Sequence, residues 1–309
     1  MLALTATLFV LTANGAVNVG GGGFCFSSAG LHLPDRYLSL GLNLLAILSS
    51  GILMYLLNKT FTFIRAFTLI YVSTFYMLEA SNPYLSASLL DGSLLCLILL
   101  AASFILFSSY GVQRSQQNIW LTFTILAFGS MFQYVCLYLI PVFFIGFIQM
   151  RAMSFKGLLA MCAGVFTPFW ILIGTGIVAP SDFSLPTMHN VWGYLNSMQS
   201  LTMISSVAFA VITVIALMAV NLIQIYSYKA QPRAYNGFFS ILTIATIIIM
   251  AIDYGNMLNY LPVLNCCLAI QIAHTFSMNN ASKRFIAYLI FMAVCVAIFG
   301  LHFLSINIG

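Results

Sequence analysis

The stretch NPYLSASLLDGSLLCLILL, residues 82–100, is long and apolar enough to cross a lipid bilayer, yet it carries one carboxylate, Asp91. A spanning helix needs about 20 apolar residues, and an ionisable side chain at bilayer depth costs at least roughly 2.5–3.5 kcal/mol. Asp91 therefore lies near an edge of the membrane, has a partner, or takes part in function. The topology of the whole chain decides among these.

The rest of the chain is equally apolar. Of its 309 residues, 62% are hydrophobic and only 5% are charged, whereas a soluble domain has roughly 25% charged residues. So few charges cannot cover a water-facing surface, which predicts an all-α polytopic membrane protein with a single transmembrane domain over residues 1–309. The net charge of +5 comes from scattered bases, so it reports membrane orientation and gives no sign of a nucleic-acid partner.

Apolar runs predict about 11 spanning helices. They cover residues 2–19, 37–57, 61–80, 85–110, 119–133, 135–150, 154–178, 199–226, 237–252, 257–274 and 284–306. The first has no basic start and no clean cleavage site, which favours a membrane helix over a signal peptide. The fifth and sixth form either a helical hairpin or one broken helix, and the ninth and tenth are also short. Residues 1–178 give a seven-helix module, and residues 199–306 a four-helix module.

Lysine and arginine orient these helices. Nine of the ten bases flank every second junction between predicted helices, and only Arg36 lies at the others. The positive-inside rule then predicts a cytoplasmic N-terminus and an outer C-terminus. All five acids map to the outer side: Asp35, Glu79, Asp91, Asp182 and Asp253. Glu79 is expected where the third helix leaves the membrane, and Asp91 about two turns inside the fourth helix, facing the bundle interior.

Two polar stretches on the outer side form the candidate site. Residues 18–37 hold Asp35 and Arg36, and residues 179–197 hold Asp182 and His189. A carboxylate can take a proton from an acceptor hydroxyl, and an arginine can neutralise phosphate, so this set suits sugar transfer from a lipid phosphate. Asp35 is the candidate catalytic base. The candidate substrate-binding residues are Arg36, Asp91, Glu79, Asp182 and His189, with Arg36 also the available salt-bridge partner of Asp91 on that side.

Sequence motifs for other chemistry are missing. The four histidines lack HExxH spacing, which argues against a zinc site, and the cysteines lack metal-ligand spacing. The glycine run at 20–23 lacks the GxxxxGK[ST] pattern and indicates a flexible hinge. We therefore expect no metal and no cofactor. Polar residues within the predicted helices are expected to hydrogen-bond between helices: Asn43, Gln133, Asn221, Gln224, Asn265 and Gln271.

One stretch resembles a known group of proteins: NIWLTFTILAFGSMFQYVCLYLIPVFFIGFIQMRAMSFKGLLAMCAGVFTPFWILIGTG, residues 118–176. This stretch resembles an uncharacterised bacterial inner-membrane family in three features. These are a helix pair that ends in a proline-bearing apolar run, a short basic loop, and a following helix with a TPF step. That resemblance implies a fold and a location in the bacterial inner membrane, but it does not indicate an activity.

More loosely, the layout is similar to that of GT-C glycosyltransferases, with Asp35 of LPDRY as the acid in the first outer loop. This resemblance implies a polyprenyl-phosphate-linked sugar as donor and a catalytic carboxylate in that loop. The chain departs from the pattern because the loop is short and Arg36 stands where a second acid is usual.

Two functions stay open at the level of sequence. The first is an enzyme of cell-envelope glycan assembly that uses a lipid-linked sugar, with membrane lipid and polyprenyl phosphate as its partners. The second is a non-catalytic membrane subunit that packs against a protein partner, or a small transporter. The absence of a specific catalytic motif in the sequence motivates the second.

Overall fold

The computed structural model describes residues 23–24, 36–64, 69–86, 91–112, 115–179, 183, 197–225, 229–276 and 281–308. Within these residues the regular structure is helical, without strands. The predicted all-α class is therefore confirmed for this part of the chain. The predicted helix at 2–19 lies outside the described residues.

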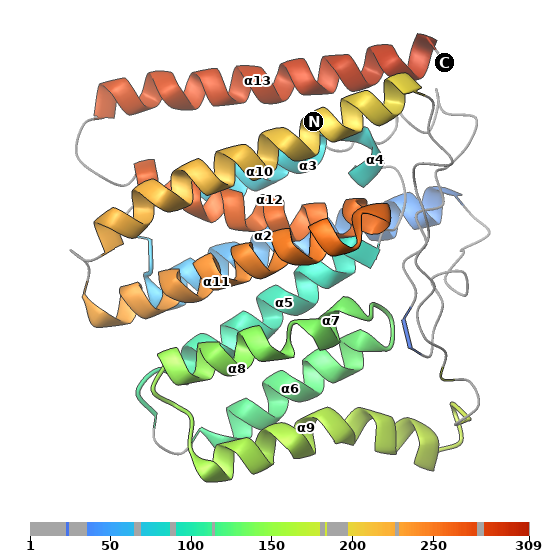
Figure 1. Cartoon of the computed structure of the whole chain (residues 1–309), viewed down its shortest axis with the longest axis vertical. Coiled ribbons are helices and arrows are strands. Elements are labelled where there is room, and N and C mark those ends of the chain that lie inside the picture. Colours follow the sequence, from blue (N-terminus) through green and yellow to red (C-terminus); the bar gives the residue numbers. More distant parts are fainter. Residues whose placement is uncertain are drawn as a thin grey trace.

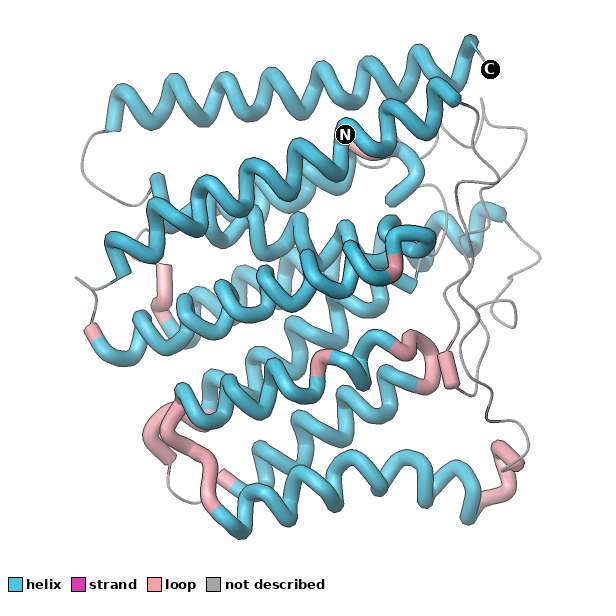
Figure 2. The backbone as a smooth tube through the Cα atoms, viewed as in Figure 1, coloured by secondary structure: helices cyan, strands magenta, loops and turns pink. Residues whose placement is uncertain are grey.

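The helices form one bundle, and successive long helices run between the same two ends (Figure 1). In chain order they are α2 (Arg36–Phe61), α3 (Ile70–Ser81), α4 (Pro83–Ser86), α5 (Asp91–Ser108), α6 (Gln116–Ser130), α7 (Val135–Tyr138), α8 (Ile140–Gln149), α9 (Phe155–Gly174), α10 (Ser197–Ile225), α11 (Ala230–Ile252), the 3-10 turn η4 (Tyr254–Asn256), α12 (Met257–Phe276) and α13 (Ala281–Ile308). Figure 2 shows most of the described loops at the two ends of the bundle; the break between α7 and α8 and the link between α3 and α4 lie away from the ends.

Seven of the described helices are long and apolar enough to cross a membrane. They are α2, α5, α9, α10, α11, α12 with its preceding turn, and α13. The short α3 is largely buried in the bundle, where a half-length membrane helix is tolerated, whereas α6 and α7–α8 each keep one apolar face exposed. The direction in which the bundle crosses the membrane stays a prediction.

The predicted segment 61–80 is wrong at its start, because α3 begins only at Ile70. Thr62 has a left-handed φ of 44°, a conformation that ends a helix. The Ile64 amide then donates to the Asn58 side chain at 2.9 Å, which holds the chain in a turn. As a result α3 has only 12 residues.

Of the two alternatives for the fifth and sixth predicted segments, the structure has the hairpin, formed by α6 and α7–α8. The segment α7–α8 keeps the predicted bounds but is itself broken. Its break falls beside Pro141, in the first turn of α8, because proline lacks the amide hydrogen that would continue the α7 turn. The ninth segment is not short, since α11 starts at Ala230 and has 23 residues.

The core of the bundle is α12. The spanning window within Tyr254–Thr275 is 100% buried, whereas those of α9, α10 and α13 are 17%, 22% and 11% buried. Helix α12 packs against α3, α5, α10 and α11, so helices from both ends of the sequence surround it. The apolar outer faces of α9, α10 and α13 are suited to lipid.

Charges separate to opposite ends of this bundle. Lys59 lies in the last turn of α2, and the other bases with described side chains precede or begin α9 and α11: Arg151, Lys156, Lys229 and Arg233. We call this the basic end, on the left of Figure 1. Asp91 begins α5 and Asp253 follows α11, and both lie at the opposite end, which we call the acid end.

Candidate functional site

A buried carboxylate, Asp253, is the centre of a polar cluster at the acid end. The hydroxyls of Tyr134 and Tyr260 both donate to its Oδ2 atom and lie 2.9 Å from each other. The Asn256 amide donates to both carboxylate oxygens at 3.1 Å. Three donors from separate positions therefore stabilise one carboxylate. We call these four residues the Asp253 cluster.

The local sequence explains why these side chains meet. Helix α11 ends at Ile252, the turn η4 follows, and α12 begins at Met257, so Asp253, Asn256 and Tyr260 come from one helix corner. Tyr134 comes from the corner between α6 and α7. The cluster therefore joins two corners of the bundle that lie far apart in the sequence.

Gly23 packs closely against the α6–α7 corner. A Cβ at this position would lie only 1.8 Å from the Met131 carbonyl oxygen, and the neighbouring Phe24 amide donates to the Ser130 carbonyl at 3.3 Å. Only glycine permits such an approach of two backbones. For Gly23 the expected hinge role is thus replaced by a packing role, while residues 20–22 lie outside the described part.

Asp91 is the first described residue of α5, and residues 87–90 before it lie outside the described part, so its predicted place two turns inside the fourth helix stays a prediction. It is buried, with 7% of its surface exposed, which confirms that it faces the bundle rather than lipid. The next residue, Gly92, packs against the backbone of Asn259 in α12.

Glu79 lies deeper than predicted. It is fully buried, and its Oε1 accepts a hydrogen bond from the Asn265 amide of α12 at 2.9 Å. Asn265 is near the middle of α12, so Glu79 is not at the mouth of the bundle. The reason is the late start and short length of α3, which ends inside the bundle.

The remaining predicted site residues are not brought together by the described structure. Arg36 begins α2, but its side chain lies outside the described part, as do Asp35, Asp182 and His189 altogether. The expected pairing of Arg36 with Asp91 therefore stays a prediction. Among the described residues, no group of three or more histidines, cysteines or acids could hold a metal ion.

Buried amides flank the Asp253 cluster. The side chains of Gln133 and Asn259 precede Tyr134 and Tyr260 in the sequence and are buried. Neither amide has a hydrogen-bond partner among the described residues. Buried polar groups are normally satisfied, by ordered water or a ligand if not by protein. The acid end therefore has unused hydrogen-bonding capacity.

Other polar side chains within the helices join neighbouring helices, as predicted. Asn221 donates to the Gln271 side chain at 2.7 Å, Asn265 donates to Glu79, and Asn43 donates to the Leu85 carbonyl at 2.7 Å. Gln133 differs, because its amide has no such partner in the described part. The Gln224 side chain lies outside that part.

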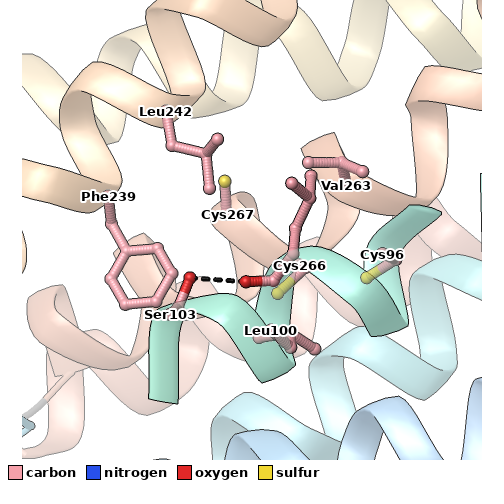
Figure 3. Close-up of a pocket in the computed structure, with 9 residues that line it drawn as sticks. Cys96, Leu100, Ser103, Phe239, Leu242, Val263, Cys266 and Cys267 are labelled. Atoms are coloured by element: carbon pink, nitrogen blue, oxygen red, sulfur yellow. Dashed lines mark hydrogen bonds between the residues drawn. The ribbon is translucent and has the colours of Figure 1, made fainter. Parts of the chain in front are cut away.

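A small cavity lies between α5, α11 and α12 (Figure 3). Its volume of about 10 Å³ is close to the minimum for a single water molecule. Three thiols and apolar side chains line most of it, and the Ser103 hydroxyl donates to the Leu99 carbonyl at 2.6 Å. This cavity is a feature of core packing and is too small for a substrate.

From the sequence, Asp253 is predicted to be an outer acid but is not among the candidate site residues, and neither Tyr134 nor Tyr260 is predicted to contact it. One local feature of the sequence points to this site: Asp253 and Asn256 are three residues apart at a helix boundary. Asp and Asn side chains at such positions commonly form hydrogen bonds with nearby backbone and side-chain groups. Nothing in the sequence pairs Tyr134 with residues 119 and 126 positions away.

Comparison with protein-family models, curated proteins and solved structures found no match. The class of the protein therefore rests on its own fold. Seven helices with the length and composition of membrane spans define a multi-pass helical membrane protein.

Proposed function

We propose that the protein is an enzyme of cell-envelope glycan assembly in the bacterial inner membrane. It transfers a sugar from a polyprenyl-phosphate-linked donor at the acid end. The observation that carries this proposal is the separation of Asp91 and Asp253 from the described bases, which lie at the opposite end of the bundle. By the positive-inside rule the basic end faces the cytoplasm and the acid end faces outward.

The connectivity of the chain supports the same location. Helix α2 begins at the acid end with Arg36, directly after Asp35. Helix α9 ends there and α10 begins there, and the chain between them contains Asp182 and His189. The segments that carry these four candidates are thus attached to the end that holds Asp91 and the Asp253 cluster.

The proposed roles follow from side-chain chemistry. Asp35 takes the proton of the acceptor hydroxyl as general base, and Arg36 neutralises the phosphate of the donor. Asp91, Asp182 and His189 bind polar groups of the substrates. Glu79 lies too deep in the bundle to share this site with them.

The Asp253 cluster and the buried amides serve the site indirectly. Hydrogen bonds from Tyr134 and Tyr260 fix the two corners beneath the site through Asp253. Gln133 and Asn259 offer amide donors whose bonding capacity is unused within the described structure. Asp253 is accordingly a positioning residue in this proposal.

The experiment is a transfer assay with the full-length protein and native lipid-linked donors. Loss of a general base lowers the rate by about 10²–10⁴-fold, so Asp35→Asn should lose that much turnover. Lys59 is exposed at the basic end, so Lys59→Gln should leave turnover unchanged. Full activity of folded Asp35→Asn would remove the catalytic assignment.

Native mass spectrometry separates this function from the non-catalytic alternative. An enzyme of this kind should purify from native membranes with a bound lipid phosphate and without a stoichiometric partner. A stoichiometric protein partner and no bound lipid phosphate would instead support a membrane subunit. Vesicle uptake of a solute, without sugar transfer, would support a small transporter.

A further inference from the structure

Glu79 is an unusual carboxyl because it is fully buried and poorly hydrogen-bonded. Its Oε1 accepts one hydrogen bond, from the Asn265 amide at 2.9 Å. Its Oε2 is buried and has no hydrogen-bond partner among the described residues. One of the two carboxyl oxygens of Glu79 therefore lies in the interior without a hydrogen bond from the described residues.

The depth of Glu79 follows from its partner. Asn265 is eight residues beyond the first residue of α12, which corresponds to about 12 Å along the helix axis. All residues from 256 to 274 around it are buried. Glu79 thus lies near the middle of the bundle, away from the water at either end.

No positive charge neutralises Glu79 within the described structure. The five basic side chains described there are exposed and lie at the basic end. The helices that pack against α3 are α2, α4, α12 and α13. Of the ionisable groups on α12, the Cys266 thiol lies close enough to Glu79 to interact with its charge, and Cys96 of α5 lies beside Cys266 in the small cavity.

The other packed helices contribute uncharged or distant groups. On α13, the Tyr288 hydroxyl contacts Ser73 and Thr74 near the opposite end of α3, and the His302 ring packs on Tyr84 of α4. On α2, Lys59 is exposed in the last turn, at the basic end. A carboxylate at Glu79 would therefore have no counter-charge in the part of the chain that the structure describes.

Burial decides which form of this carboxyl is stable. A buried, unpaired carboxylate is far more costly than the neutral acid, which needs only ordinary hydrogen bonds. Ionisable groups inside a membrane are accordingly candidates for proton binding. We propose that Glu79 is a proton-binding site in the interior of the bundle, with Asn265 as its positioning residue. This inference is independent of sugar transfer.

Proton release from such a site has a structural consequence. Loss of the proton leaves an unpaired charge between α3 and α12, which is tolerable only when water or a cation enters that interface. Protonation of Glu79 thus holds α3 against α12, and release of the proton loosens their contact. The site gives the protein a proton-linked step inside the membrane region.

The test uses a hydrophobic carbodiimide on the full-length protein in lipid vesicles. The protonated carboxyl adds across a C=N bond of the reagent: its oxygen bonds to carbon, its proton moves to nitrogen, and the adduct rearranges to a stable N-acylurea. Peptide mass spectrometry should locate one adduct at Glu79, and its yield should fall as the pH is raised. A water-soluble carbodiimide should not label this position, because the carboxyl is buried.

Matched variants sharpen the result. Glu79→Gln keeps the shape and the Asn265 hydrogen bond but should abolish the adduct. Asp253→Asn, which changes a second buried carboxyl at the acid end, should leave the Glu79 adduct intact. Because the adduct is located in the wild-type chain, the test does not depend on whether either variant folds.

Three outcomes would overturn the proposal. The first is a wild-type chain without an adduct at Glu79 at any pH, and the second is labelling that does not fall as the pH is raised. The third is suppression of labelling by sodium ions at constant pH, which would make the site one for an alkali cation. Unchanged labelling in sodium supports the proton as the occupant.

Discussion

At the scale of single residues, Asp253 and Glu79 are both buried carboxyls, but their surroundings differ. Asp253 receives hydrogen bonds from two phenols and one amide, whereas Glu79 receives one. Donors directed at a carboxylate stabilise its charge, and an unsatisfied buried oxygen favours the neutral acid. We therefore assign Asp253 to structure and Glu79 to proton binding.

Removal of one donor from Asp253 tests the structural assignment. Tyr260→Phe keeps the ring but loses a hydrogen bond to a buried carboxylate, which should lower the free energy of unfolding by about 1.5–3 kcal/mol. Tyr254→Phe is the control, because Tyr254 is 60% exposed. Unfolding of both variants is measured in detergent micelles. Equal stability of the two variants would contradict the assignment.

At the scale of elements, glycines let particular helices approach one another closely. Helices α6 and α9 are in extensive contact, and a Cβ at Gly164 of α9 would lie 2.6 Å from the Trp120 carbonyl oxygen of α6. In α5, a Cβ at Gly92 would lie 2.5 Å from the Asn259 carbonyl oxygen of α12. Small residues at such crossings are the usual means of helix association in membranes.

The α6–α9 contact gives a prediction with an internal control. Gly164→Ala inserts a methyl group against rigid backbone, so it should destabilise the protein by about 1–3 kcal/mol, the usual cost of overpacking. Gly174→Ala adds the same methyl group at the end of α9, where nothing lies within 4 Å. Thermal unfolding in micelles compares the two. A loss of stability in Gly174→Ala as large as that in Gly164→Ala would refute close packing at Gly164 as the cause.

At the scale of the whole molecule, the described charges separate along the bundle. The described bases lie at one end and Asp91 and Asp253 at the other, with the wholly buried α12 between them. Topology follows lysine and arginine. We therefore expect the basic end in the cytoplasm.

Labelling with a membrane-impermeant maleimide tests this orientation. Lys156→Cys, at the basic end, should react only in inverted vesicles, and Tyr254→Cys, at the acid end, only in intact cells. Both positions are exposed. The background should lack Cys25 and the exposed Cys162, since the other cysteines are buried. The reverse pattern of reaction would invert the topology and move the acid end to the cytoplasm.

The amino-acid sequence by itself determined the class of fold and the distribution of charge. Apolar runs located ten of the helical segments that the structure describes, to within a few residues at most ends, because bilayer thickness and backbone hydrogen bonding leave a lipid-embedded chain few alternatives. Burial of Asp91 also followed from the cost of exposing a charge to lipid.

Only the tertiary structure decided the depth of Glu79 and the partners of Asp253. Glu79 meets Asn265 across 186 positions, and Tyr134 meets Asp253 across 119. These contacts depend on how far each helix is shifted along its axis and rotated about it. For α3 that shift is set by the turn at Thr62, and for α12 by packing of glycine against its backbone. The hydropathy of the sequence does not report the axial shift or the rotation of a helix, because an apolar helix has almost the same composition on every face.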